Sequence, residues 1–190
     1  MTEERIRAEL SLIEALDETE QAHLDDARAW AASGAPLFRI AKPATPPKHL
    51  VAYFAVVDEE DGDDPHILLV DHRNAQMWLP TGGHVEPGED PRVTVARELQ
   101  EELGISIQPE QVQAPRMVTV TETVGLTSGH VDVSLWYAVR ASRTAPVVVD
   151  REEFKDARWF SFHEAARLRS DPHLWRFLAK LRSKDFLLCR

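Results

Sequence analysis

Hydrophobic residues recur at helical spacing near the start of the chain and give way to short apolar runs further on. Residues 2–33 contain no proline, and their apolar side chains repeat every three or four positions: Ile6, Leu10, Ile13 and Leu16, then Leu24, Ala27 and Ala31. This spacing predicts a helical N-terminal segment. Gly34 and Pro36 end the pattern, and the Pro-rich stretch 42–49 predicts a connector that is not helical.

The middle of the chain alternates apolar, β-prone runs with turn signals. Runs at residues 50–57 and 67–70 flank the turn-forming segment 58–65, which predicts a hairpin. Residues 78–83 predict a short strand that enters a Gly-rich loop. Further strands are predicted at residues 117–124, 131–139 and 158–162.

Two helix starts carry the same local signature, an Asp followed by a Pro. Asp90 and Pro91 are an N-cap residue and a first helical residue, and Gly104 supplies the stop. Asp171 and Pro172 repeat the start, followed by an apolar stripe of Leu174, Phe177, Leu178 and Leu181. The order of helices, strands, helix, strands and helices predicts an α/β fold with a mixed or antiparallel sheet covered by helices.

Length and charge limit the classes of function. The 190 residues suit one domain with an appendage, and we expect a helical segment with its linker at 1–46 and the main domain at 47–190. The formal net charge of −10 disfavours a nucleic-acid polymer as partner. A phosphate-bearing substrate would therefore need a local cation.

The compartment is predicted from what the sequence lacks. Cys189 is the single cysteine, so no internal disulfide can form, and we expect it to be an inert part of the tail. The N-terminus is charged and has no apolar signal core. No run approaches the roughly 20 apolar residues that span a bilayer, so we expect a cytoplasmic protein with no membrane partner.

Three carboxylates lie close together on the helix predicted from Pro91. At about 100° per residue, Glu98, Glu101 and Glu102 share one arc, while Val95, Leu99 and Leu103 share another. Hard cations such as Mg²⁺ and Mn²⁺ prefer oxygen ligands. The glycines 82 and 83 would let the main chain approach a metal or a phosphate. The alternative is a solvated acidic helix face.

The same residues resemble a known sequence motif. Gly83, Glu89 and the run Arg97, Glu98, Leu99, Gln100, Glu101, Glu102, Leu103, Gly104, Ile105 match every fixed position of the Nudix box. The resemblance to the Nudix hydrolase (MutT-like) family extends from about residue 47 to 181 and leaves out the N-terminal segment. It implies an α/β/α sandwich around a mixed sheet, and cleavage of a diphosphate linked to another moiety with Mg²⁺ or Mn²⁺.

The resemblance also implies roles for particular residues. Glu98, Glu101 and Glu102 would bind metal, with the carbonyl of Gly82 as a further ligand. Arg97 would orient Glu98 through a charge-assisted hydrogen bond. The loop and helix positions of the box, Gly83, Glu89 and Gly104, would be structural, and Glu89 could also reach a metal through water.

A later glutamate helps as ligand or base in several relatives of this family. Glu153 is the candidate by position, and Glu152 is its nearest rival. The alternative is a solvated acidic loop.

Other polar and aromatic residues have two interpretations each. Trp78 either packs under the Gly-rich loop or borders a pocket, and His84 is expected at the surface or near a phosphate rather than on a metal. His130 lies beside a strand whose alternation puts Asp132, Ser134 and Trp136 on one face, where they border a pocket or, for Trp136, fill the core. Arg73 is either a phosphate contact or a solvated side chain.

The leading hypothesis is a Mg²⁺-dependent hydrolase of nucleoside triphosphates or nucleoside diphosphate derivatives. A non-catalytic nucleotide-binding module is the alternative, and a diphosphate isomerase would need a better placed cysteine than Cys189. Family markers for ADP-ribose and for dinucleoside polyphosphates, a Pro and a Tyr downstream of the box, are absent at Val120–Thr123, which favours nucleoside triphosphates. A homodimer stays open.

Overall fold

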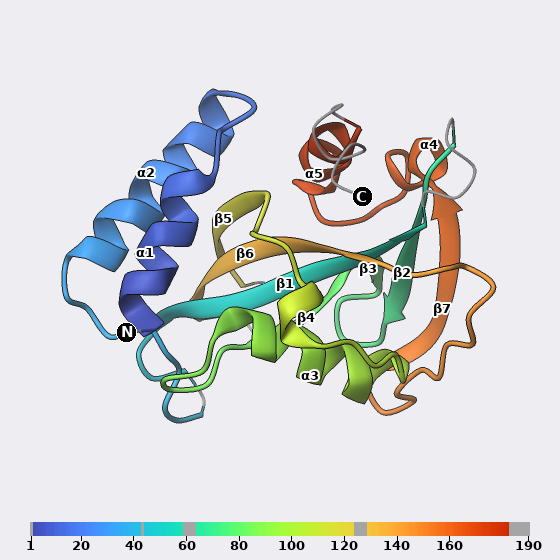
Figure 1. Cartoon of the computed structure of the whole chain (residues 1–190), viewed down its shortest axis with the longest axis horizontal. Coiled ribbons are helices and arrows are strands. Elements are labelled where there is room, and N and C mark those ends of the chain that lie inside the picture. Colours follow the sequence, from blue (N-terminus) through green and yellow to red (C-terminus); the bar gives the residue numbers. More distant parts are fainter. Residues whose placement is uncertain (1, 43, 59–63, 124–128, 183–190) are drawn as a thin grey trace.

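A twisted mixed sheet forms the centre of the computed structural model, which describes residues 2–42, 44–58, 64–123 and 129–182 (Figure 1). The strand order is β3-β2-β1-β6-β5, with β4 also paired to β1 and β7 to β2. β1 and β6 run parallel and all other pairs are antiparallel. The strands are β1 (Lys48–Asp58), β2 (His66–His72), β3 (Met77–Leu79), β4 (Thr81–His84), β5 (Met117–Glu122), β6 (Val131–Arg140) and β7 (Phe154–Ser161). The predicted mixed sheet is confirmed.

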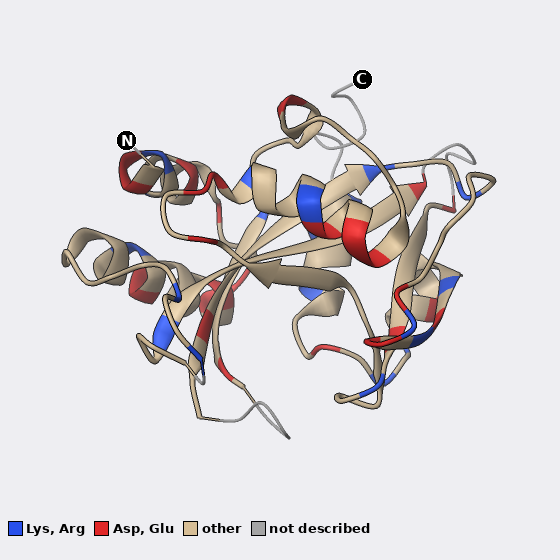
Figure 2. Cartoon of the chain, turned by 90° about the horizontal axis from the view of Figure 1, so that it is seen from below, with Lys and Arg blue, Asp and Glu red and all other residues tan. Residues whose placement is uncertain are grey.

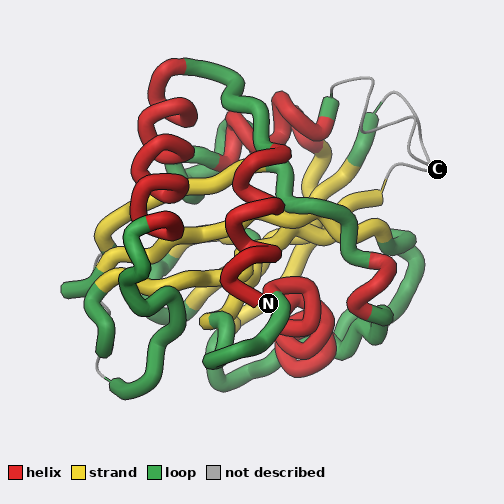
Figure 3. The backbone as a smooth tube through the Cα atoms, turned by 60° about the vertical axis from the view of Figure 1, so that its left-hand side comes forward, coloured by secondary structure: helices red, strands yellow, loops and turns green. Residues whose placement is uncertain are grey.

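Helices cover both faces of this sheet (Figures 1 and 3). α3 (Pro91–Leu103) lies on one face, and α4 (Phe162–Ala165) and α5 (Leu174–Leu181) lie on the other. α1 (Thr2–Leu12) and α2 (Glu18–Ala32) form an antiparallel pair beside β5. A short 3₁₀ turn spans Pro109–Gln111. None of the helices in the described ranges combines the length and apolarity that crossing a bilayer requires.

Most predicted elements are present, with differences at their ends. The predicted hairpin is the antiparallel pair β1–β2, although residues 59–63 of its turn lie outside the described part of the chain. The predicted strand at 78–83 is two strands, since Pro80 interrupts the ladder between β3, which pairs with β2, and β4, which pairs with β1. The strand predicted at 117–124 ends at Glu122, and both Val124 and Cys189 lie outside the described residues.

The helical segments also differ in detail. The predicted N-terminal helix is interrupted at residues 13–17, where Asp17 caps α2 by accepting a hydrogen bond from the Glu20 N–H at 2.9 Å. The last helix begins at Leu174 rather than at Pro172, with His173 as its N-cap residue.

The core consists of two clusters, one on each face of the sheet. Leu50, Ala52, Phe54 and Val56 of β1 pack with α1, α2 and α3, while Ala55 and Val57 face α5. Strand alternation explains this division. The N-terminal helices therefore share a continuous core with the sheet. Packing of α2 also covers the β5 edge, where the Val120 N–H donates to His23 Nδ1 at 3.1 Å.

A buried polar network joins α1 to α3. Glu9 is 3% exposed, and its carboxylate accepts from the Tyr137 hydroxyl at 2.9 Å and from Arg92 at 2.9 and 3.0 Å. Beside it, Arg5 forms a 2.5 Å ion pair with Asp90, the N-cap residue of α3. The first turn of α3 is thus held by the first helix of the chain.

Candidate active site

The helix α3 has the boundaries that its capping residues predict. Asp90 accepts a hydrogen bond from the Arg92 N–H at 3.0 Å, and Pro91 occupies the first turn. Gly104 ends the helix in a left-handed conformation with φ of 67°. Val95 and Leu99 are buried, which fixes the rotation of the helix about its axis and directs Glu98 and Glu102 toward the Gly-rich strand β4. Figure 2, a view from the α3 side, shows basic and acidic positions following one another along a helix.

Arg97 lies at the centre of a charged network. Its Nη1 donates to Glu98 Oε1 at 2.6 Å and reaches Glu101 Oε2 at 3.5 Å, and its Nη2 reaches Glu89 Oε2 at 3.4 Å. Glu89 also accepts from the Thr94 hydroxyl at 2.7 Å and from the Glu86 N–H at 3.2 Å. Burial opposes ionisation of Glu89, but these hydrogen bonds lower its pKa below the ordinary value. Glu89 therefore stays anionic and anchors the loop to Arg97.

The three clustered glutamates do not occupy equivalent positions. Glu98 and Glu102 line a cleft of about 840 Å³ together with Gly82, Gly83 and Glu153. The side chain of Glu98 is 15% exposed, whereas that of Glu101 is 60% exposed. The helix thus brings two carboxylates into the cleft and leaves the third at its outer side.

Glu102 carries the most perturbed carboxylate of the cleft. It is 6% exposed, and its Oε2 is buried without a hydrogen-bond partner within the described ranges. Burial, followed by the charges of Glu98 and Glu153, raises the pKa of Glu102 to about 9, although a hydrogen bond from Thr81 opposes the shift. Burial also raises the pKa of Glu98 despite the nearby Arg97. A bound cation would relieve both the lost hydration and the repulsion, so these residues fit a divalent metal.

The two glycines of β4 are required by close approaches of different kinds. A Cβ on Gly82 would lie 2.6 Å from the Ala52 carbonyl oxygen and 2.9 Å from the Tyr53 Cα, both in the backbone of β1. A Cβ on Gly83 would lie 1.9 Å from Glu98 Oε1, which is the mobile end of a side chain. Gly82 therefore permits strand pairing, and Gly83 permits the placement of Glu98.

We expect Gly83→Ala to lower kcat by about 10²-fold, the scale of an ångström-sized misplacement in an active site. The added methyl group must push the Glu98 carboxylate away, while the backbone keeps its path, so the melting temperature should change little. Steady-state rates and thermal melts of the same preparation test this. Gly82→Ala is the matched variant, and there the melting temperature should fall first. A Gly83→Ala enzyme with the wild-type rate would contradict this role.

The segment before β7 brings further acidic residues to the cleft. The Asp150 N–H donates to the Glu102 carbonyl at 2.9 Å, so this segment runs along the end of α3. Glu152 and Glu153 both line the cleft, and the charge of Glu153 contributes to the raised pKa of Glu102. Arg73 holds the segment, since its N–H donates to the Glu153 carbonyl at 3.0 Å and its Nε donates to the Arg151 carbonyl at 3.1 Å.

Two cationic residues on the cleft were not singled out from the sequence. Arg39 and Lys42, from the connector between α2 and β1, line the same cleft as the glutamates. They are the local cations that an acidic chain would need for a phosphate-bearing substrate. Their position depends on how the connector folds back, which no local pattern indicates.

A second cavity adjoins the acidic cleft. It has a volume of about 520 Å³ and shares His72 and Asn74 with the cleft. Met77 and Leu79 give it apolar walls, and it also contains Thr121, Thr123 and Asp171. Burial raises the pKa of the Asp171 carboxyl, although the His173 N–H hydrogen bond opposes the shift.

The remaining residues considered in the sequence have defined surroundings. Trp136 is fully buried, lies 5.2 Å from the Phe177 ring and donates from Nε1 to the Thr119 hydroxyl at 3.0 Å, so it is a core residue. Trp78 packs edge-on against Phe160 at 5.1 Å. Burial and the charge of Arg39 lower the pKa of His84 to about 4. Its neighbours His49, His130 and Asp132 are described below.

The comparison with protein families agrees with the motif on α3 and the surrounding sheet. The family model described as NUDIX domain matches residues 48–181, most of the chain. The chain belongs to the NUDIX family. This places the domain among the diphosphohydrolases of that family, which act on nucleotide derivatives and generally use a divalent metal.

A curated relative agrees with this assignment. The NAD-capped RNA hydrolase NudC of Stutzerimonas stutzeri (strain A1501) is 33% identical over 106 residues, which cover 55% of this chain and 34% of that protein. The chain thus matches about a third of the length of this relative.

The structures share the fold. An Ap4A hydrolase of C. elegans, solved as a binary complex, has a TM-score of 0.57 at 20% identity, covering 70% of this chain and 93% of its own. The NUDIX domain of Shewanella oneidensis NrtR, solved with ADP ribose, has a TM-score of 0.56 at 15% identity, covering 70% and 85%. The predicted Nudix sandwich is confirmed.

Proposed function

We propose that this chain is a Mg²⁺- or Mn²⁺-dependent hydrolase that cleaves the diphosphate linkage of a nucleoside triphosphate or of a nucleoside diphosphate derivative. The observation that carries the proposal is the buried Oε2 of Glu102, which has no hydrogen-bond partner among the described residues and lies beside Glu98 in a cleft that also contains Glu153. A side chain in this position is stabilised by a cation, and a diphosphate is a common co-ligand of such a cation.

The metal ligands proposed are Glu98, Glu101 and Glu102, with the carbonyl of Gly82. Glu101 is more exposed than the other two, but it shares Arg97 with Glu98. A divalent cation bound there would neutralise the diphosphate and lower the pKa of an attacking water. Arg97 would hold Glu98 in place, and Glu89 would hold Arg97.

The general base proposed is Glu153. It lines the cleft from the segment before β7, and its charge acts on both Glu98 and Glu102. It would accept the proton of the attacking water. Glu152 stays the rival, since it lines the same cleft, and the alternative of a solvated loop predicts that neither glutamate affects turnover.

The two adjoining cavities support the proposed substrate class. Arg39 and Lys42 would neutralise phosphate groups, and the neighbouring cavity near Thr121 and Asp171 would accept a base or another organic group. NAD-capped RNA, Ap4A and ADP ribose are named for the related proteins, and all contain a nucleoside diphosphate unit. We infer that the substrates are small molecules that contain this unit, with nucleoside triphosphates included.

A panel of substrates tests the proposal. Nucleoside triphosphates, dinucleoside polyphosphates, ADP-ribose and an NAD-capped RNA would be incubated with the protein and Mg²⁺ or Mn²⁺, and the products identified. Metal-dependent cleavage within a diphosphate supports the hydrolase. Tight binding without turnover across the panel would instead support the non-catalytic binding module.

Arg39→Ala should raise KM by about tenfold and change kcat less. A charge-assisted hydrogen bond contributes about 1.5–3 kcal/mol, and a tenfold change in affinity corresponds to ~1.4 kcal/mol. Arg167→Ala is the control, since it removes an exposed arginine that lines neither cavity. Equal KM values for the two variants would remove Arg39 from the phosphate site.

A further inference from the structure

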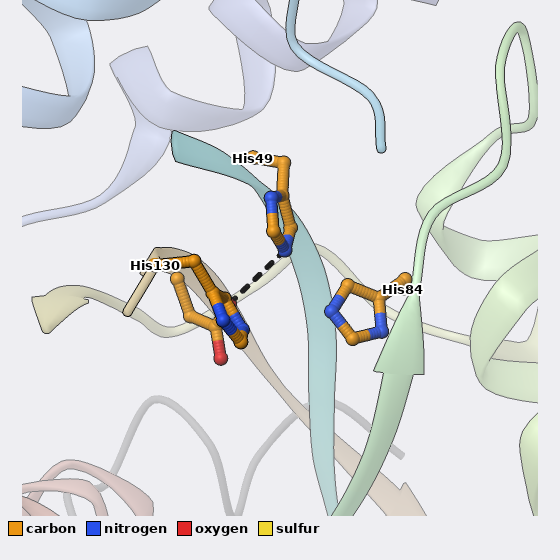
Figure 4. A group of neighbouring side chains, drawn as sticks. His49, His84 and His130 are labelled. Carbon is orange, nitrogen blue, oxygen red and sulfur yellow. Dashed lines mark ion pairs between the residues drawn. The ribbon is translucent and has the colours of Figure 1, made fainter. Parts of the chain in front are cut away.

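Three histidines and an aspartate meet at the end of three neighbouring strands, and one of them, His84, also lines the glutamate cleft. His49 on β1 is the register partner of Asp132 on β6, and Val51 is the partner of His84 on β4. His130 lies two residues before Asp132. Because side chains two positions apart share a face, strand pairing brings all four to one side of the sheet. Figure 4 shows the three histidines turned toward one another.

The distances within this group suit the coordination of a single ion. One ligand atom from each of His49, His84, His130 and Asp132 lies within 4.8 Å of the others. Asp132 Oδ1 is 3.3 Å from both His49 Nε2 and His130 Nε2. A tetrahedral site with metal–ligand bonds of about 2.0–2.1 Å has edges of roughly 3.3–3.4 Å. The two 3.3 Å distances from Asp132 Oδ1 therefore match two edges of such a tetrahedron.

The proton of His49 is located by its hydrogen bond. Its Nδ1 lies 2.9 Å from the Pro46 carbonyl oxygen, which can only accept, so Nδ1 carries the proton. In a neutral ring, Nε2 then presents a lone pair to Asp132 Oδ1, another acceptor. Both atoms are buried without a hydrogen-bond partner among the described residues, and His49 is fully buried. Two acceptors facing each other need either a proton or a metal ion between them.

Each of the other two imidazoles also contributes a ring nitrogen to this group. The Thr123 hydroxyl donates to the His130 carbonyl at 3.2 Å, and His130 Nδ1 lies 3.2 Å from the same hydroxyl oxygen. When the hydroxyl donates to the carbonyl, Nδ1 of His130 is the donor to the hydroxyl oxygen, and its Nε2 faces Asp132 Oδ1. His84 Nε2 is also buried and unpartnered in the described ranges. Hydrogen bonds from the far ring nitrogens are what orients metal-binding histidines in proteins.

We propose that His49, His84, His130 and Asp132 bind one transition-metal ion, and that zinc fits best. Imidazole suits zinc, whereas Mg²⁺ prefers oxygen ligands, so this site would differ in metal from the glutamate cleft. A proton on His49 would satisfy only its own contact with Asp132. A metal ion would satisfy all three ring nitrogens together.

The bound ion would fasten the Gly-rich strand. His84 directly follows Gly83, and its carbonyl oxygen accepts from Arg97 Nη2 at 3.4 Å. Zinc bound to the His84 ring would therefore connect β4 to β1 and β6 next to Arg97, the residue that orients Glu98. This role is structural and does not depend on which substrate the cleft takes.

Zinc content and cobalt spectra of the full chain, prepared without a polyhistidine tag, test the proposal. After metal removal and re-equilibration with zinc, we expect one tightly held zinc per chain. Cobalt should give the visible absorption of a four-coordinate ion. His130→Gln and Asp132→Asn, both partly exposed positions, should weaken zinc binding by about 100-fold or more and abolish the zinc-dependent rise in melting temperature.

Two controls separate this site from other sources of zinc binding. His163→Ala removes an exposed histidine outside the cluster, and Glu102→Gln alters the glutamate cleft; both should keep the zinc. Equal zinc in all variants, or none in the wild type, would overturn the proposal. If Asp132→Asn lowers the melting temperature but zinc does not raise that of the wild type, a proton rather than a metal ion joins the histidines to Asp132. Loss of hydrolysis does not enter these outcomes.

Discussion

Glu102→Gln is expected to reduce kcat by about 10³-fold or more. A catalytic metal contributes several kcal/mol of charge stabilisation, and ~1.4 kcal/mol corresponds to a factor of ten in rate. Glutamine keeps the size of the side chain but cannot become the anionic ligand that a metal ion would need at this buried position. Steady-state rates with saturating Mg²⁺, on whichever substrate of the panel is cleaved, measure the effect.

The matched control is Glu110→Gln, an exposed glutamate in the 3₁₀ turn, which should keep the wild-type rate. If Glu102→Gln hydrolyses substrate as fast as the wild type, the glutamates of α3 do not hold the catalytic metal. Weak activity restored by high Mg²⁺ or Mn²⁺ would instead agree with a weakened ligand set.

The same residue should make the metal-free protein sensitive to pH. The folded-state pKa of Glu102, about 9, is above its ordinary value of 4.5. The folded protein thus binds this proton more tightly than the unfolded chain, and stability falls as pH rises from about 4.5 to about 9. Thermal melts in chelator should show this fall in the wild type and a flatter curve in Glu102→Gln. Added Mg²⁺ should stabilise the wild type most at high pH.

Glu9→Ala should lower the free energy of unfolding by about 3–5 kcal/mol, the usual effect of removing one member of a buried ion pair. Its loss leaves the Tyr137 hydroxyl and the Arg92 guanidinium without their shared acceptor between α1 and α3. Denaturant unfolding monitored by fluorescence measures the change.

Two other substitutions bracket this effect. Glu9→Gln keeps an acceptor oxygen for Tyr137 and should lie between the wild type and Glu9→Ala. Glu4→Ala removes an exposed charge on the same helix and should change stability by no more than about 0.5 kcal/mol. Equal midpoints for Glu4→Ala and Glu9→Ala would mean that the network contributes nothing net.

Helix ends that are set by nearby capping residues could be predicted from the sequence. The limits of α3 follow from Asp90, Pro91 and Gly104, each of which acts within one turn of the helix. The break before α2 also has a local signal, but the regular apolar spacing on both sides of it predicted a continuous helix. Asp17 is followed three residues later by Glu20. The Asp17 side chain accepts a hydrogen bond from the Glu20 N–H, and the Glu20 side chain accepts one from the Leu16 N–H at 2.8 Å.

Tertiary placement was beyond the reach of these signals. Helical spacing put Glu98, Glu101 and Glu102 on one arc, but the packing of α3 against the sheet decides that Glu102 is buried and Glu101 exposed. The histidine cluster needs the strand order and the register of β4, β1 and β6, which no pattern within a single strand contains. Arg39 reaches the cleft only because its connector turns back.

The shared interior of the N-terminal helices has a practical side. The family match begins at residue 48, yet Ile6, Leu10 and Leu24 pack into the same cluster as Phe54 and Leu99. A fragment that begins at the start of the match would expose one apolar side of the sheet to water. It would also leave the Tyr137 hydroxyl without its acceptor Glu9. A fusion protein that contains this domain should therefore include α1 and α2 as well.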